Sequence, residues 1–204
     1  ADHCIGSSSA VRDLLRRIYR RDAAVLDPPV DLSQFAPSAT RDDYYLVVSR
    51  LIPYKRVDIA IEAFNRLRRR LVIIGDGRDR ARLESLAGPT IEFCGRLSDR
   101  ETRAAMAQAK AFIFPGLEDF GLTPVEAQAS GRPVIAYAAG GALDTVIPGL
   151  TGAWFYPQTA DALAHAVEAT NVDALDPAAC RANAARFDVS VFRQRLADFI
   201  DGME

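Results

Sequence analysis

The sequence is poor in the residues that build covalent or metal cross-links. Among 204 residues there are three cysteines and two histidines, and the cysteines, at positions 4, 94 and 180, lie far apart. An odd, scattered set argues against a disulfide framework, and these residues are too few for a ligand cluster. We therefore expect a reduced, cytoplasmic chain that holds no structural metal.

Long apolar runs and a strong charge imbalance are missing as well. No run approaches the roughly 20 residues that cross a bilayer, and the first residues lack the basic-then-apolar order of a secretory signal. The formal net charge is -2 at pH 7, which gives no overall attraction to nucleic acid. We expect no nucleic-acid partner.

Lysine is scarce too, because only Lys55 and Lys110 accompany many arginines. Arginines cluster at 16–21 and again at 66–70. Both clusters lie on or at the end of amphipathic helical segments, whose polar sides are solvated. We interpret both as solvated helix faces and not as a membrane or nucleic-acid surface.

What the sequence does contain is a regular alternation of apolar bursts and helical stretches. The helical stretch at 57–67 places apolar residues at helical spacing. The bursts, rich in valine and isoleucine without polar alternation, are typical of strands covered on both faces. They lie at 44–49, 71–75, 90–95, 111–115 and 133–137. The fold class predicted is α/β, an open Rossmann-like parallel sheet with helices on both faces.

Candidate chemistry follows the ends of these strands, where such sheets bind their ligands. The segment 114–131 leads from a strand into a helix and carries Glu118 and Glu126 on either side of a Phe-Gly pair. A helix start favours an anion such as phosphate, and carboxylates suit sugar hydroxyls. By contrast, GDGRDR after the second strand lacks the third glycine of a dinucleotide fingerprint, which excludes nicotinamide and flavin.

Five motifs in order carry a family resemblance. They are SRLIPYKRVD (49–58), IGDG (74–77), GRLSD (95–99), the Glu-x7-Glu pair around Phe120-Gly121-Leu122, and AGGALDTV (139–146). The chain resembles the C-terminal, donor-binding half of a retaining GT-B glycosyltransferase of family four. The sequence of these motifs is most similar to that of mannosyltransferase-like enzymes of bacterial polysaccharide assembly.

The resemblance implies catalytic roles for Arg50, Lys55 and Glu118. Arg50 and Lys55 would hold the donor diphosphate in place of a metal, since fixed cations stabilise a leaving group as it gains charge. Glu118 would contact hydroxyls of the transferred sugar. The alternatives are a strand-capping Arg50, a solvated Lys55 at a helix start and a loop-surface Glu118.

The remaining donor-binding residues follow from the same resemblance. Glu126 would accept hydrogen bonds from the ribose hydroxyls, although Thr123 to Glu126 also fits a helix-capping box. Backbone groups of the Phe-Gly-Leu centre would approach phosphate or sugar. Asp144 stands where relatives have glutamate, so its role stays open. The full donor-binding set is Glu126, Phe120, Gly121, Leu122, Gly75, Arg96 and Leu97, the last two beside the base.

The predicted organisation has four parts. Residues 1–26 resemble the tail of an N-terminal domain, 27–43 form an interdomain linker because Pro28 and Pro29 forbid helix, 44–187 form the nucleotide-sugar domain, and 188–204 form a cross-over helix. Helices are also expected near 159–170 and 177–186. Partners implied are the N-terminal GT-B domain and a glycan or lipid-linked glycan acceptor.

The function expected is nucleotide-sugar binding in a metal-independent hexosyltransferase, with GDP-mannose as donor and no cofactor. We expect this chain to bind its donor without efficient transfer. Peripheral contact of the longer enzyme with the inner membrane stays open. The alternative from another class is a stand-alone nucleotide-sugar-binding module without transferase activity.

Overall fold

A six-stranded parallel sheet organises the chain in the computed structural model, which describes residues 3–202. Its strand order is β5-β4-β3-β6-β7-β8, so the direction of growth reverses between β3 and β6. The bounds are β3 Tyr45–Val48, β4 Leu71–Ile74, β5 Ile91–Gly95, β6 Ala111–Phe114, β7 Val134–Tyr137 and β8 Gly152–Phe155. This topology confirms the predicted fold class.

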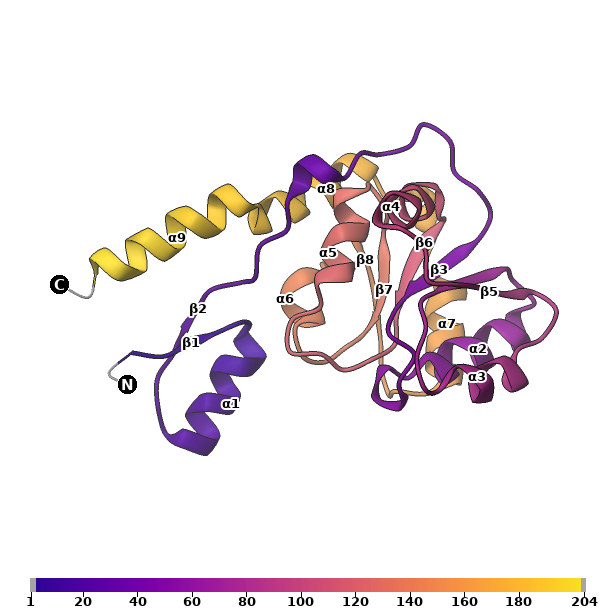
Figure 1. The fold of residues 1–204 in the computed structure, drawn as a ribbon, viewed down its shortest axis with the longest axis horizontal. Coiled ribbons are helices and arrows are strands. Elements are labelled where there is room, and N and C mark those ends of the chain that lie inside the picture. The colour runs from indigo at the N-terminus through magenta and orange to yellow at the C-terminus, as the bar shows by residue number, and fades with distance from the viewer. Residues whose placement is uncertain (1–2, 203–204) are drawn as a thin grey trace.

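Helices cover both faces of this sheet (Figure 1). Alternation along the strands decides which face each side chain serves: Tyr45 and Val47 join one buried cluster, whereas Leu46 between them joins the other. The first cluster packs under α2 Val57–Leu67, α3 Arg80–Leu86 and α7 Ala160–Ala169. The second packs under α4 Asp99–Gln108, α5 Leu122–Ala129, α6 Ala142–Thr145 and α8 Pro177–Ala184. The prediction of helices on both faces is confirmed.

The structure corrects the number of strands expected from the sequence. The five apolar bursts all form strands, and β8 adds a sixth at the edge beside β7. Its sequence, Gly-Ala-Trp-Phe, is short, and Trp154 is 37% exposed. An edge strand with one exposed side lacks the continuous apolar run by which the inner strands are identified.

A smaller lobe lies beside the sheet and contains the first and last described elements of the chain. It comprises β1 Ile5–Gly6, α1 Ser9–Tyr19, β2 Ala24–Val25 and α9 Val189–Asp201, with β1 and β2 paired in parallel. Figure 1 shows α9 running back from α8 toward the N-terminal segment, and Arg195 of α9 donates to Asp27 over 2.7 Å. We call residues 3–26 and α9 the outer lobe.

The connection from the outer lobe to the sheet is mostly extended, with one 3-10 turn, η1 Leu32–Gln34. It is tied to the end of the fold, because the amide of Val30 donates to the carbonyl of Phe187 over 2.8 Å. Further 3-10 turns are η2 Pro53–Lys55, η3 Val172–Ala174 and η4 Ala185–Phe187. The four-part division stays a prediction, and its outermost residues, 1–2 and 203–204, lie outside the described residues.

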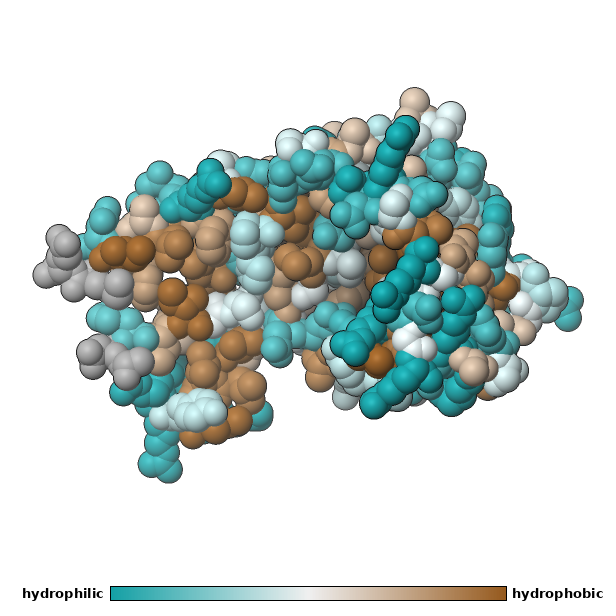
Figure 2. Space-filling view, in the orientation of Figure 1, coloured by the Kyte–Doolittle hydropathy of each residue, from teal (hydrophilic) through white to brown (hydrophobic). Residues whose placement is uncertain are grey.

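The outer lobe exposes many apolar side chains, which appear as brown areas in the left half of Figure 2. Exposed members are Ile5, Leu14, Ile18, Tyr19 and Ile200. Within residues 3–202, α1 and α9 contribute no buried side chain. None of the helices in that range has the length and apolar character of a membrane span.

Candidate functional site

Two connected hollows open at the carboxyl ends of the strands, beside the point where strand order reverses. The first has a volume of about 380 Å³ and the second about 540 Å³, and they share Val48, Ser49, Arg50 and Thr123. Both lie within the size range of small-molecule sites. The first is lined by Arg50, Lys55, Glu118, Phe120, Gly121 and Leu122, and the second by Arg50, Gly75, Arg96, Leu97 and Glu126. The structure thus brings all ten predicted site residues to one place.

The first hollow contains an ion pair between Lys55 and Glu118, with 2.5 Å from Nζ to Oε1. Lys55 ends the 3-10 turn η2, which follows β3, and Glu118 follows β6. Their side chains are only 16% and 24% exposed. Lys55 is therefore not a solvated helix start, and Glu118 is not a loop-surface carboxylate. Each holds the other's charge in a partly desolvated site.

The start of α5 turns backbone amides toward the first hollow. Gly121 has φ 84°, and a Cβ there would lie 2.7 Å from the ring of Phe114, so glycine is required. The amides of Gly121, Leu122 and Thr123 donate to no other group within the described residues. Free N–H groups at a helix start, with its positive dipole end, form a local anion site.

The Phe-Gly-Leu centre divides its side chains between core and surface. Phe120 is 4% exposed and packs against Phe187, with 5.5 Å between ring centroids. Only its backbone can reach a ligand. Leu122 is 44% exposed, so its side chain is free to contact one.

Glu126 is half-buried on α5 and faces the second hollow. The capping-box alternative is wrong: Gly121 is the N-cap of α5, without a side-chain cap, and the box forms instead between Ser98 and Glu101 at α4. Burial raises the pKa of Glu126, while Arg103 lowers it and Asp99 adds to the rise. The Glu126 carboxyl group therefore does not cap α5 and is available to a ligand in the second hollow.

Two residues that the sequence analysis did not single out, Asp99 and Thr102, also line the second hollow. Asp99 is the last residue of the GRLSD motif, and its place in that motif is the sequence signal by which it could have been identified as a site residue. Its carboxylate makes no ion pair or side-chain hydrogen bond within the described residues. It is an exposed acceptor in the lining that it shares with Glu126.

The loop behind Glu118 is held by the Gly140-Gly141 pair. The amide of Gly141 donates to the carbonyl of Glu118 over 3.0 Å, and a Cβ on Gly141 would lie 2.2 Å from the Phe120 backbone. Asp144, one turn further on, accepts from the amide of Ser9 at 2.7 Å and its hydroxyl at 2.6 Å. Asp144 therefore joins the carboxyl edge of the sheet to the start of α1.

Comparisons with known proteins identify the family of the chain. The family model for glycosyl transferases group 1 matches residues 31–187. A GDP-mannose-dependent alpha-mannosyltransferase of Mycobacterium tuberculosis is 41% identical over 68% of this chain and 41% of its own length. A second enzyme with that name, from Mycolicibacterium smegmatis, is 40% identical over 60% of this chain and 36% of its own. A glycogen synthase of M. tuberculosis is 39% identical over 91% of this chain and 49% of its own.

Solved structures share the fold. Sucrose-phosphate synthase from Thermosynechococcus elongatus has a TM-score of 0.85 at 26% identity and covers 100% of this chain and 58% of its own. Anabaena HepE, in complex with UDP and glucose, has a TM-score of 0.84 at 24% identity over 98% of this chain and 63% of its own.

The chain spans less than half the length of these curated relatives. Its sheet and helices correspond to the C-terminal half of a GT-B enzyme. With the family model matched across the sheet and the site motifs, this chain belongs to the glycosyl transferases group 1 family.

Proposed function

We propose that this chain is the donor-binding half of a retaining, metal-independent hexosyltransferase that takes mannose from GDP-mannose. The observation that carries this proposal is the convergence of Arg50, Lys55, Glu118 and Glu126 on two connected hollows at the switch point of the sheet. The GDP-mannose-dependent relatives support the choice of donor.

The order of residues along the hollows suggests how a nucleotide sugar lies. Glu126 would accept from the ribose hydroxyls in the second hollow. The diphosphate would sit in the first, between Arg50, Lys55 and the free amides at the start of α5. Glu118, paired with Lys55 in the same hollow, would contact the hexose beside the diphosphate.

This arrangement matches the charge that develops during transfer. When the bond between the anomeric carbon and the diphosphate oxygen breaks, the electron pair goes to the diphosphate. Arg50 and Lys55 would stabilise that charge more strongly in the transition state than in the bound donor. The chain thereby supplies a divalent cation's usual electrostatic role with its own side chains.

Asp99 supports guanine as the base. Guanine presents an N–H and an exocyclic NH₂ side by side on one edge, whereas uracil has one N–H between two carbonyls. A carboxylate accepts both guanine donors as a bidentate pair and repels the uracil carbonyls. Asp99, free in the second hollow, would make that distinction.

The outer lobe supports a further domain as partner. Its apolar side chains are exposed, and the curated relatives are more than twice as long as the part matched here. We propose that the N-terminal GT-B domain packs on this lobe and that the acceptor, a glycan or lipid-linked glycan, binds between the halves.

Titration calorimetry of this chain with GDP, UDP and ADP in EDTA tests the proposal. GDP is expected to bind most tightly, and Asp99→Asn to reduce its advantage over UDP. Equal affinity for all three nucleotides would refute the base assignment. Absence of binding to any of them would refute the site itself.

A further inference from the structure

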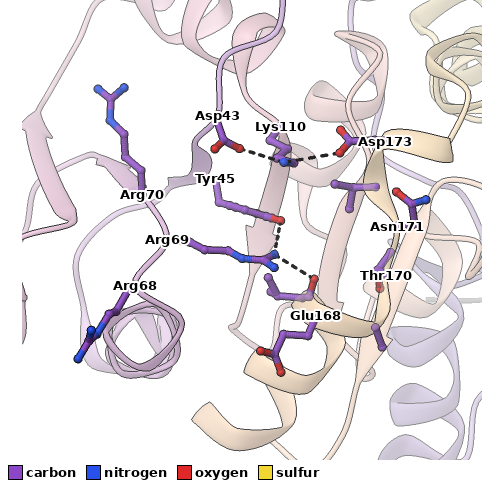
Figure 3. A pocket seen from close by; sticks show the side chains of 13 residues that line it. Asp43, Tyr45, Arg68, Arg69, Arg70, Lys110, Glu168, Thr170, Asn171 and Asp173 are labelled. Carbon is purple, nitrogen blue, oxygen red and sulfur yellow. Dashed lines mark hydrogen bonds and ion pairs between the residues drawn. The ribbon is translucent and has the colours of Figure 1, made fainter.

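The opposite edge of the sheet carries a polar cavity of about 580 Å³, larger than either hollow of the donor site. It lies at the amino ends of β3, β4 and β6, where Tyr45, Arg70 and Lys110 stand. Its walls are the turn between α2 and β4 and the segment from the end of α7 into η3 (Figure 3). The two hollows proposed to bind the nucleotide sugar lie at the carboxyl edge of the sheet, so this cavity is separate from them.

Two of the cations around this cavity, Lys110 and Arg69, already have partners within the described residues. Lys110 donates to Asp43 over 2.9 Å and lies 3.6 Å from Asp173. Arg69 donates to the hydroxyl of Tyr45 over 3.0 Å and to the carbonyl of Val167 over 3.5 Å. Both networks fix the side chains before any ligand arrives.

The run of three arginines does not converge on one point. In Figure 3 only Arg69 turns toward the opposite wall, while Arg68 and Arg70 point away from it. Arg70 instead pairs with Glu92 over 3.0 Å. The cavity therefore lacks the cluster of inward-pointing cations that recognises a phosphate or another small anion.

The end of α7 provides hydrogen-bond acceptors that an anion cannot use. The carbonyls of Glu168 and Ala169 accept no hydrogen bond from any described residue, and a helix C-terminus carries negative partial charge. The side chains of Glu168 and Asn171 also have no partner within residues 3–202. Opposite them, Arg69 retains unused N–H donors.

A ligand of this cavity must therefore donate to the carbonyls and the Glu168 carboxylate and accept from the Asn171 amide on one wall, and accept from the Arg69 guanidinium on the other. Hydroxyl groups do both. We propose that this cavity binds a neutral oligosaccharide through its hydroxyls. Its identification with the acceptor or product glycan rests on the proposed function.

Such a site would lie remote from the transfer centre. If a glycan is held at the amino edge of the sheet while its end enters the donor cleft, the effective concentration of that end in the cleft rises, because the second binding event becomes intramolecular. The absence of an exposed aromatic ring from the lining implies that each attachment is weak. The chemistry indicated is reversible glycan binding, without catalysis.

Amide NMR titration of the ¹⁵N-labelled chain with a linear α-mannooligosaccharide and, separately, a maltooligosaccharide tests this inference. At least one is expected to shift amides at 69–71 and 167–173. Asn171→Ala and Glu168→Gln should each weaken binding about three- to tenfold, since each removes or weakens one hydrogen bond. Arg66→Ala, on α2 but outside the lining, is the matched control and should bind like wild type.

Two results would overturn the inference. One is the absence of shifts with both oligosaccharides, or variants that bind as wild type does. The other is inorganic phosphate shifting the same amides and displacing the sugar, which would make the cavity an anion site. GDP titration of the same samples reports on 118–126, so failure of the donor site is seen separately.

Discussion

Replacing Glu118 by glutamine should tighten the binding of a bare nucleoside diphosphate. In the ligand-free site Lys55 already holds a carboxylate at 2.5 Å, so an incoming diphosphate must share or displace it. Glu118 also repels the phosphate charge directly. Glutamine keeps the size and an acceptor oxygen but removes the charge, which frees Lys55 for the ligand.

The magnitude follows from the partial burial of the pair. Two unit charges about 4 Å apart attract by about 4 kcal/mol at an effective dielectric of about 20, which sets the scale for a partly buried pair. Fully exposed pairs contribute about 0 to 1 kcal/mol. With side chains 16% and 24% exposed, an intermediate value of about 1.5 kcal/mol is reasonable, which is about tenfold in affinity.

Calorimetry with GDP and GDP-mannose measures the effect. Glu118→Gln should bind GDP about tenfold more tightly, but the gain should be smaller for GDP-mannose because the charge-assisted bond to the sugar is lost. Asp119→Asn removes a neighbouring exposed carboxylate that has no ion-pair partner within the described residues, and should change affinity less than about twofold. Weaker GDP binding by Glu118→Gln, or an equal effect of Asp119→Asn, would refute the reasoning.

Further predictions concern Lys55, Glu126 and Asp144. Lys55→Ala should weaken GDP binding at least about tenfold in EDTA, whereas Lys110→Ala, at the opposite edge, should not; calorimetry compares them. Because burial raises the pKa of Glu126, GDP affinity should rise with pH through that raised pKa, and calorimetry across pH should find no such rise in Glu126→Gln. Because the pKa of Glu126 is higher in the folded than in the unfolded state, the free energy of unfolding falls as pH rises between these two pKa values. Glu126→Gln, which carries no charge to bury, should therefore raise the melting temperature at pH 7. Asp144→Ala should speed amide exchange in the first turn of α1, whereas Asp31→Ala, which removes similar but local bonds, should not.

The inner strands of the sheet could be predicted from the sequence because their local composition identifies them. Strands buried on both faces must be apolar throughout, so the bursts from 44–49 to 133–137 identify them. The edge strand β8 was missed because Trp154 faces outward. The helix over Val57–Leu67 was predictable from its periodicity.

Capping chemistry shows the limit of a local motif. Thr123 to Glu126 and Ser98 to Glu101 both fit the capping box. The structure forms only the second, because Gly121 with φ 84° takes the N-cap of α5. Both segments fit equally well in sequence, and the tight approach of Gly121 to Phe114 decides between them.

Contacts between distant residues could not be predicted. The motifs placed Lys55 and Glu118 at the same edge, but only the fold shows that they neutralise each other. Asp144 stands where the family resemblance implies a glutamate, and its partner, Ser9, lies near the other end of the chain. The arginines at 66–70 fit a solvated face, yet Arg69 turns in to Tyr45.

A crystal structure with GDP bound tests the central claim most directly. Diphosphate oxygens are expected within about 2.7–3.2 Å of Lys55 Nζ and the Arg50 guanidinium. The ribose hydroxyls are expected on Glu126, and Lys55 should have moved away from Glu118. A nucleotide bound elsewhere, or in the hollows with Lys55 still held by Glu118 and no contact to phosphate, would contradict it.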